Sequence, residues 1–198
     1  MDIQVIRKSI MSCKRCLLRE QRRGAPHGGD HPTFLFLGQS LHGDENDTPF
    51  LCKSGGVLDK AFEALGWPTV ATANTKSVYA LYNIVACHTP NNTPPTDPEI
   101  AMCRLHLLFA IKELNPKFII SLGGFSTEQV ALLAGCQRPA RDEVVKLCDG
   151  HFFASLPHPA FALRGGEEAI GGWVKLVSAF LHRLEKWRNK DAAKDNRS

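Results

Sequence analysis

Short apolar runs alternate with amphipathic stretches along most of the chain. Residues 33–38 (TFLFLG) form an apolar run that ends at a glycine, which is typical of a buried strand leading into a loop. In residues 57–66 (VLDKAFEALG), apolar side chains recur at helical spacing and Gly66 provides a stop. The same signals predict further strands at 78–85, 118–122 and 151–156, and further helices at 97–114, 126–134 and 167–188.

This alternation favours an α/β fold in which helices cover both faces of a parallel sheet. With 198 residues, 43% of them hydrophobic, the chain is long enough for one core and short for two. We expect a single domain over residues 1–188 and a polar, disordered tail over residues 189–198. Because ligands in such folds bind beyond the carboxyl ends of the strands, the loops 38–50, 83–92, 123–124 and 157–164 should share one crevice.

Charge and hydropathy narrow the class of protein only slightly. The formal net charge of +4 suits a polyanionic partner, but many proteins that never bind nucleic acid share it. No apolar run approaches the length that crosses a bilayer, and the first sixteen residues lack the apolar core of a signal peptide. We therefore expect a soluble, cytoplasmic monomer with no membrane partner and no obligate protein partner.

The seven cysteines are unevenly spaced, which favours thiolate ligands over disulfides in an intracellular chain of this size. Cys13 and Cys16 form a CxxC pair, and Cys87 and Cys103 are separated by fifteen residues. Four thiolates suit either zinc or a 4Fe-4S cluster, and spacing does not distinguish the two. Alternatively, Cys87 and Cys103 are small buried residues, as we expect for Cys52, Cys136 and Cys148.

A series of motifs surrounds these cysteines. In chain order they are CKRC, FLGQSLHGDEN, PFLCKSGGVLD, YNIVACHTPNN, IISLGG and LPHPAFALR. Over residues 13–164, the order of these motifs and of the cysteines resembles family 4 of the uracil-DNA glycosylase superfamily. The resemblance implies a three-layer α/β/α sandwich with a central four-stranded parallel sheet. It also implies a 4Fe-4S cluster, rather than zinc, held by Cys13, Cys16, Cys87 and Cys103.

The resemblance further implies a monofunctional DNA glycosylase. Such an enzyme hydrolyses the N-glycosidic bond of a pyrimidine flipped out of single- or double-stranded DNA and leaves an abasic site. Phe50 would stack on the base, Asn83 would bind its edge, and His158 would donate a hydrogen bond to the base oxygen that gains charge. The simpler alternatives are a core phenylalanine, a turn asparagine and a structural histidine. No lysine lies in a motif suited to Schiff-base chemistry, so we expect no strand cleavage.

The DNA itself would be contacted from two regions. Phe161 and Leu163 would fill the gap left in the duplex, and Arg164 would bind phosphate. The basic residues of the cysteine segment would present positive charge to the phosphates, although a solvated basic face is an equal alternative. They are Lys14, Arg15, Arg19, Arg22 and Arg23.

The first active-site motif departs from the family pattern. Family 4 typically has a glutamate where this chain has Gln39, followed by a Pro-Gly turn that is missing here. Glutamine can position water or contact the base, but it cannot supply the charge that an oxocarbenium-like transition state needs. Asp44 or Glu45 would then be the carboxylate, unless the acidic stretch is only a solvated loop, and His42 would be a base contact and a further acid or base.

The altered motif leaves the substrate open. The pocket could be reshaped for a modified pyrimidine, such as glucosylated hydroxymethylcytosine in phage DNA, which would make the protein an antiphage defence enzyme. Two other classes are a catalytically weak member that binds DNA without turnover and an unrelated zinc-binding α/β protein.

Overall fold

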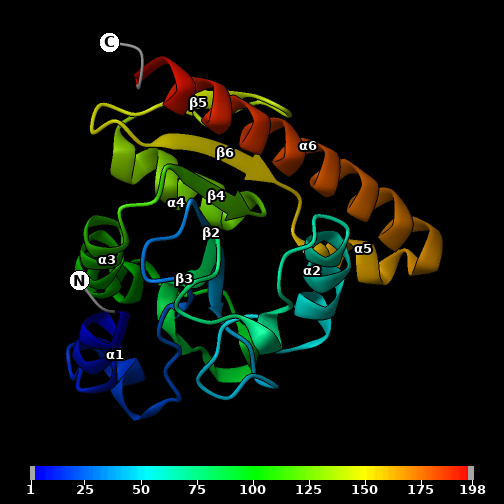
Figure 1. Ribbon diagram of the computed structural model, residues 1–198. Helices are drawn as coiled ribbons and strands as arrows, with labels where there is room; N and C mark the ends of the chain where they lie inside the picture. Colours follow the sequence, from blue (N-terminus) through cyan, green and yellow to red (C-terminus); the bar gives the residue numbers. More distant parts are fainter. Residues whose placement is uncertain (1–2, 196–198) are drawn as a thin grey trace.

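A six-stranded sheet forms the centre of the protein in the computed structural model, which describes residues 3–195 and the side chains up to residue 188 (Figure 1). The strand order is β1-β3-β2-β4-β6-β5. The strands are β1 (His27–Gly28), β2 (Phe34–Leu41), β3 (Tyr79–His88), β4 (Phe118–Leu122), β5 (Val144–Lys146) and β6 (Phe152–Leu156).

The four central strands β3, β2, β4 and β6 are parallel, and β1 and β5 are antiparallel edge strands. The prediction of a four-stranded parallel sheet is therefore right for the centre and incomplete at both edges. Because the edge strands have only two and three residues, they carry no apolar run or alternation that a sequence pattern could reveal. The prediction of an α/β/α sandwich is confirmed.

Helices cover both faces of this sheet (Figure 1). On one face lie α1 (Ile3–Met11), α3 (Asp97–Leu114) and α4 (Gly124–Ala134). On the other face lie α2 (Lys53–Glu63), α5 (Pro159–Arg164) and α6 (Gly166–Asp195). The side chains of β2 alternate between the two cores, because Leu35 and Leu37 pack under the first group and Phe34 and Phe36 under the second.

Several element boundaries differ from those predicted. Helix α1 was not predicted, although Ile3, Ile6 and Ile10 form its buried stripe at helical spacing. Strands β2 and β3 continue three residues beyond the predicted ends, and α5 is helical where a loop was expected. Helix α6 runs past residue 188 to Asp195, and residues 196–198 of the predicted tail lie outside the described residues.

Three short 3-10 helices complete the described chain, at Leu17–Glu20, Val70–Thr72 and Pro90–Asn92. The first follows the CxxC pair, and the third follows β3 at the edge of the predicted crevice. Among the described helices, none combines the length and the apolar character that a bilayer-spanning helix requires.

Candidate active site

Gly38, near the carboxyl end of β2, lies beneath the Phe50 ring and the Asn83 amide, which both line the candidate site. It is the register partner of Asn83 on β3, so the two residues lie side by side on neighbouring strands. A Cβ atom at position 38 would lie 2.4 Å from Asn83 Oδ1 and 2.6 Å from Phe50 Cζ. A glycine is therefore required for the Phe50 ring and the Asn83 amide to meet at this point.

Asn83 is 2% exposed and lines the pocket, and no hydrogen bond of its side chain is found among the described residues. Its amide is therefore available to a ligand or water in the pocket. Its position in the crevice is consistent with the predicted base contact.

The loop after β2 is organised by Glu45. This side chain is 3% exposed, and its Oε2 accepts the His42 backbone N–H at 2.7 Å. Its Oε1 accepts the Phe50 backbone N–H at 2.6 Å and the Cys52 thiol at 3.2 Å. Burial raises the pKa of Glu45, against the lowering effect of these donors. The carboxylate thus links His42 to Phe50 across the loop and fixes the position of Phe50.

Phe50 adopts a left-handed backbone conformation, with φ at 65°. This conformation is uncommon for a bulky residue, and the Glu45 hydrogen bond compensates for part of its cost. A Cβ at Gly55 would lie 1.6 Å from the Phe50 carbonyl oxygen, so the first turn of α2 accommodates Phe50 only because residue 55 is glycine. The SGG segment of the sequence therefore supports the aromatic residue.

His158 closes the other side of the site as the N-cap of α5. Its Nδ1 accepts the Ala160 backbone N–H at 3.1 Å, so the proton of the neutral ring is on Nε2. Burial, followed by the charges of Arg164 and His42, lowers the pKa of His158 to about 4. At neutral pH the ring is uncharged. Its centroid lies 6.2 Å from that of Phe50.

These residues line one pocket of about 600 Å³ at the carboxyl ends of the parallel strands. All ten residues predicted for catalysis, base binding or the α5 contacts line it. They are Gln39, His42, Asp44, Glu45, Phe50, Asn83, His158, Phe161, Leu163 and Arg164. The prediction that the four loops share one crevice is confirmed.

Several pocket residues were missed by the sequence reasoning, among them Ser40, Cys52, Lys53, Ser54, Asn92 and Phe125. Lys53 and Ser54 begin α2, within a motif that was recognised but not assigned. Asn92 follows β3 in a left-handed conformation, with φ at 55°, and its Oδ1 accepts the Gly43 N–H at 2.8 Å. Cys52, predicted to be a small buried residue, is instead half-buried at the pocket.

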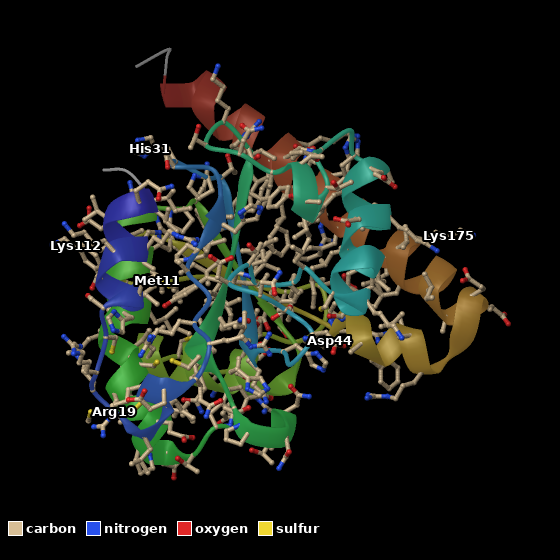
Figure 2. The ribbon with its side chains drawn as sticks, turned by 90° about the horizontal axis from the view of Figure 1, so that it is seen from below. Met11, Arg19, His31, Asp44, Lys112 and Lys175 are labelled. Atoms are coloured by element: carbon tan, nitrogen blue, oxygen red, sulfur yellow. The ribbon has the colours of Figure 1, made fainter. Side chains whose placement is uncertain are left out.

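The polar residues at the rim have different surroundings. Gln39 is half-buried on β2, directly after Gly38. Asp44 is exposed, with its Oδ2 3.7 Å from His42 Nδ1, and Figure 2 shows it beside α5. On α5, Phe161 is 67% exposed, and the Arg164 guanidinium lies 5.8 Å from its ring centroid. Leu163 is half-buried and packs against the core, so it is less available than Phe161 for insertion into a duplex.

A second cavity brings the four predicted ligands together. Cys13, Cys16, Cys87 and Cys103 all line it, between the loop after α1, the end of β3 and α3. Burial and the neighbouring thiols raise the pKa of Cys87 to about 12 and that of Cys103 to about 11. Within residues 3–195, no group of three or more His, Cys, Asp and Glu side chains has an arrangement that would hold a metal ion.

Two buried nitrogen atoms at this second cavity lack a hydrogen-bond partner among the described residues. They are Arg23 Nε and His106 Nε2, and both residues line the cavity with the four cysteines. Buried polar nitrogen atoms without partners are rare, and they indicate that a further group binds in this cavity. The surroundings of the cysteines therefore suit a negatively charged group.

The basic residues of the cysteine segment fall into two groups. Lys14, Arg15 and Arg19 are exposed, and Figure 2 shows Arg19 at the periphery beside α1 and α3. Arg22 and Arg23 instead donate hydrogen bonds to main-chain carbonyls, Arg22 to Gly43 and Glu45 and Arg23 to Cys13 and Arg19. Arg22 is nevertheless exposed, and Arg23 Nε has no partner among the described residues, so contact of this segment with phosphates stays a prediction.

Comparisons with known proteins agree with this geometry. The chain is 29% identical over 175 residues to a type-4 uracil-DNA glycosylase of Pyrobaculum aerophilum, covering 83% of this chain and 86% of that protein. It is also 29% identical over 134 residues to a type-4 uracil-DNA glycosylase of Sulfurisphaera tokodaii, covering 65% of this chain but 58% of that protein. A type-4 uracil-DNA glycosylase of Thermotoga maritima is 30% identical over 125 residues, 61% of this chain and 62% of that protein. The match thus spans less than two thirds of the last two relatives.

The profile of the uracil DNA glycosylase superfamily matches residues 25–185, which include every residue of the pocket described above. The chain therefore belongs to the uracil DNA glycosylase superfamily.

Proposed function

We propose that this protein is a monofunctional DNA glycosylase that hydrolyses the N-glycosidic bond of a flipped-out pyrimidine, with uracil as the first substrate to test. The observation that carries this proposal is the convergence of Phe50, Asn83 and His158 on one pocket above Gly38. A flipped base needs a stacking surface, a hydrogen-bonding group for its edge and a donor for the developing charge. The names of the relatives, type-4 uracil-DNA glycosylases, support uracil.

In this proposal Phe50 and Asn83 bind the base. The ring of Phe50 offers a stacking face, which contributes about 1–3 kcal/mol per base in single-strand binding proteins. The free amide of Asn83 can donate one hydrogen bond and accept another, as the edge of a pyrimidine requires. Gly38 lets these two side chains approach each other at the wall of the pocket.

His158 stabilises the leaving base. Its neutral ring offers an Nε2–H donor, since Nδ1 already accepts the Ala160 N–H. As the glycosidic bond breaks, its electron pair goes to the base, and a donor fixed next to the base oxygen lowers the energy of that anion. Water then adds to the sugar carbon, and the proton that it loses ends on the released base anion. Gln39 positions this water, and Asp44 is the carboxylate at the rim that balances the positive charge on the sugar.

Glu45 has a different role in this scheme. Both of its carboxylate oxygens accept backbone N–H groups, and the side chain is almost fully buried. We assign it to positioning Phe50 rather than to activating water.

Contacts to DNA are proposed for the exposed residues around the pocket. Phe161 is the apolar side chain available to fill the gap left by the flipped nucleotide, with Leu163 supporting it from the core. Arg164, Lys14 and Arg15 supply positive charge for the phosphates.

A modified pyrimidine is the second candidate substrate. The pocket of about 600 Å³ exceeds what one pyrimidine ring fills, and it extends past polar side chains at Ser40, His42 and Asn92. Such an extension suits a base with a large polar substituent, such as glucosylated hydroxymethylcytosine. In that case the protein serves in defence against phage rather than in repair.

One experiment separates these functions. The purified protein is incubated with single- and double-stranded oligonucleotides that carry uracil, with phage DNA that carries glucosylated hydroxymethylcytosine, and with unmodified DNA. Abasic sites are then scored by alkaline cleavage. Uracil excision alone supports the first proposal, and excision of the glucosylated base alone supports the second. DNA binding without excision from any substrate identifies a catalytically weak member and overturns both.

Strand cleavage by the protein itself is not expected. Lys53 lines the pocket but is exposed at the start of α2. A borohydride-trapped DNA adduct that disappears in Lys53→Met would overturn the monofunctional assignment.

We further propose that Cys13, Cys16, Cys87 and Cys103 hold a 4Fe-4S cluster. The four thiols share one cavity with the partnerless Arg23 Nε and His106 Nε2, which would donate to an anionic cluster. When bound, the cluster supplies a structural cross-link and no redox step, because glycosidic hydrolysis moves no electrons between substrates. Zinc is the alternative.

The cluster assignment is tested on protein purified without oxygen. Absorbance near roughly 400 nm, with iron and sulfide in equal amounts, is expected of an iron-sulfur centre. A colourless protein with one zinc ion per chain would overturn the assignment and favour the zinc site.

A further inference from the structure

We propose that Arg22 is a positioning residue that holds the pocket loop, residues 42–50, in its working shape from the cysteine-bearing segment. Arg22 lies six residues after Cys16 and outside the pocket, and the glycosylase roles proposed above do not use it. Its side chain nevertheless reaches the main chain of the loop that carries Asp44, Glu45 and Phe50.

The backbone of Arg22 is fixed against β3. The His88 N–H donates to the Arg22 carbonyl oxygen at 2.9 Å, and the Gly24 N–H donates to the Ala86 carbonyl oxygen at 2.7 Å. Between them, Arg23 and Cys87 form an antiparallel bridge. Residues 22–24 therefore behave as a short additional strand along the end of β3, next to Cys87.

From this fixed backbone the guanidinium group of Arg22 binds the loop at two points. Nη1 donates to the Glu45 carbonyl oxygen at 2.5 Å, and Nη2 donates to the Gly43 carbonyl oxygen. Two donors of one planar group define both the distance and the orientation of the peptide segment they hold. A lysine ammonium in the same place would keep the charge but lose this forked geometry.

The loop segment that Arg22 binds also positions Phe50. The Glu45 carbonyl is bound by Arg22, while the Glu45 carboxylate binds the N–H groups of His42 and Phe50. A shift of the Glu45 backbone would therefore move the Phe50 ring away from Gly38. The geometry connects Arg22 to the base-stacking face through one intermediate residue.

Two further contacts join the same segments. Arg7 on α1 forms an ion pair with Asp47 in the loop. A Cβ at Gly24 would lie 2.7 Å from Leu41 Cδ1 and 3.3 Å from Pro49 Cγ, so the residue just before the loop and a residue near its end both rest on the backbone of residue 24. The amino-terminal segment thus supports the loop along its length, with Arg22 at the centre.

The test compares Arg22→Gln, Arg22→Lys and Arg141→Gln in the full chain. Arg141 is exposed and lies outside both cavities, so its replacement controls for the loss of one positive charge. Amide hydrogen exchange is followed for residues 42–50, and kcat and KM are measured separately on the substrate that the wild-type protein excises. The exchange measurement does not depend on the proposed function, whereas the kinetic measurement rests on it.

For Arg22→Gln we expect the His42 and Phe50 amides to exchange about tenfold faster or more, because hydrogen bonds from a charged donor are lost. We expect kcat to fall about tenfold with a smaller change in KM, since the loop holds the reacting base rather than the phosphates. For Arg22→Lys, the exchange rates and kcat should lie between those of Arg22→Gln and wild type, and Arg141→Gln should match wild type in exchange.

Wild-type exchange in residues 42–50 of Arg22→Gln, or exchange that rises equally across the whole chain, would overturn the proposal. If Arg22→Gln does not fold, Arg22→Lys decides by the same two readouts.

Discussion

The Glu45 carboxylate accepts the backbone N–H of Phe50 at 2.6 Å and so holds a bulky aromatic residue in a left-handed conformation above Gly38. The hydrogen bond runs between two positions of one loop, and it sets the shape of the pocket wall. A buried carboxylate in a glycosylase pocket would ordinarily be taken for a catalytic group. Its bonding pattern instead assigns it to holding the aromatic ring.

Glu45→Gln should separate these two roles. The glutamine amide has one acceptor oxygen, and its NH₂ group would face one of the backbone N–H donors that Glu45 now binds. We expect the Phe50 and His42 amides to exchange faster and kcat/KM to fall by about 10- to 100-fold, in line with the loss of one charge-assisted hydrogen bond of about 1.5–3 kcal/mol. Hydrogen exchange and steady-state kinetics on one preparation check both effects.

Asp44→Asn is the matched comparison, because it neutralises the neighbouring carboxylate at the exposed rim. Here kcat should fall by about 10²-fold while exchange in the loop stays at the wild-type rate. A full loss of turnover in Glu45→Gln with wild-type loop exchange would instead make Glu45 the catalytic base.

His158→Gln should lower kcat by roughly 10²–10³-fold, the usual effect of removing a donor to a developing anion. The substitution should also change how stability depends on pH. The pKa of His158 is lowered from 6.5 to about 4 in the folded protein, so between these values the unfolded chain binds the proton and the folded chain does not. Wild type therefore loses stability as the pH falls from 6.5 towards 4, and His158→Gln loses less.

Thermal unfolding of both proteins at pH 7.5 and pH 5 measures this difference. Equal losses of Tm in wild type and variant would mean that the folded protein binds a proton on His158 as readily as the unfolded chain. That outcome would contradict the neutral Nε2–H donor.

The residues of the pocket could be predicted from sequence largely because parallel strands carry loops to one edge. Gly38 and Asn83 each lie near the end of a long apolar run, and an α/β fold places such ends side by side. The role of Glu45 could not be predicted in this way. Its partners are backbone N–H groups, which have no sequence signature, and only the folded loop shows that they converge on one carboxylate.

Arg22 shows a second limit of sequence reasoning. In the sequence it is one of five basic residues near a CxxC pair, and a shared charge suggests a shared role. The bridge between Arg23 and Cys87 turns the Arg22 side chain towards carbonyl oxygens, whereas Lys14 and Arg15 remain exposed. This bridge is a contact between residues far apart in the chain, and no local pattern predicts it.

Gly38→Ala should abolish base binding while leaving the fold intact. The added methyl group would overlap Asn83 Oδ1 and the Phe50 ring, and overpacking of this kind costs about 1–3 kcal/mol. We expect a lower Tm and no measurable excision, with DNA binding reduced only slightly because the phosphate contacts are elsewhere.

Gly56→Ala is the control for this glycine. Within the described residues, a Cβ at position 56 would meet no atom within 4 Å, and the residue lies in α2. Alanine there should raise stability by about 0.5–1 kcal/mol and leave excision unchanged. Wild-type excision by Gly38→Ala would contradict the role assigned here to Gly38.

Cys87→Ser should remove the proposed cluster and destabilise the protein before it affects chemistry. Cys87 is 5% exposed at the end of β3, directly beside the bridge that fixes residues 22–24. Loss of a ligand should abolish the visible absorbance, lower Tm, and raise exchange in residues 13–24 before residues 118–122 of β4 are affected.

Cys136→Ser is the control, because Cys136 is half-buried and lies outside both cavities. If Cys87→Ser keeps its colour and its Tm, then Cys87 is a buried small residue. The CxxC pair would then lack its proposed partner on β3, and support of the pocket loop would depend on the Arg23–Cys87 bridge without any cluster.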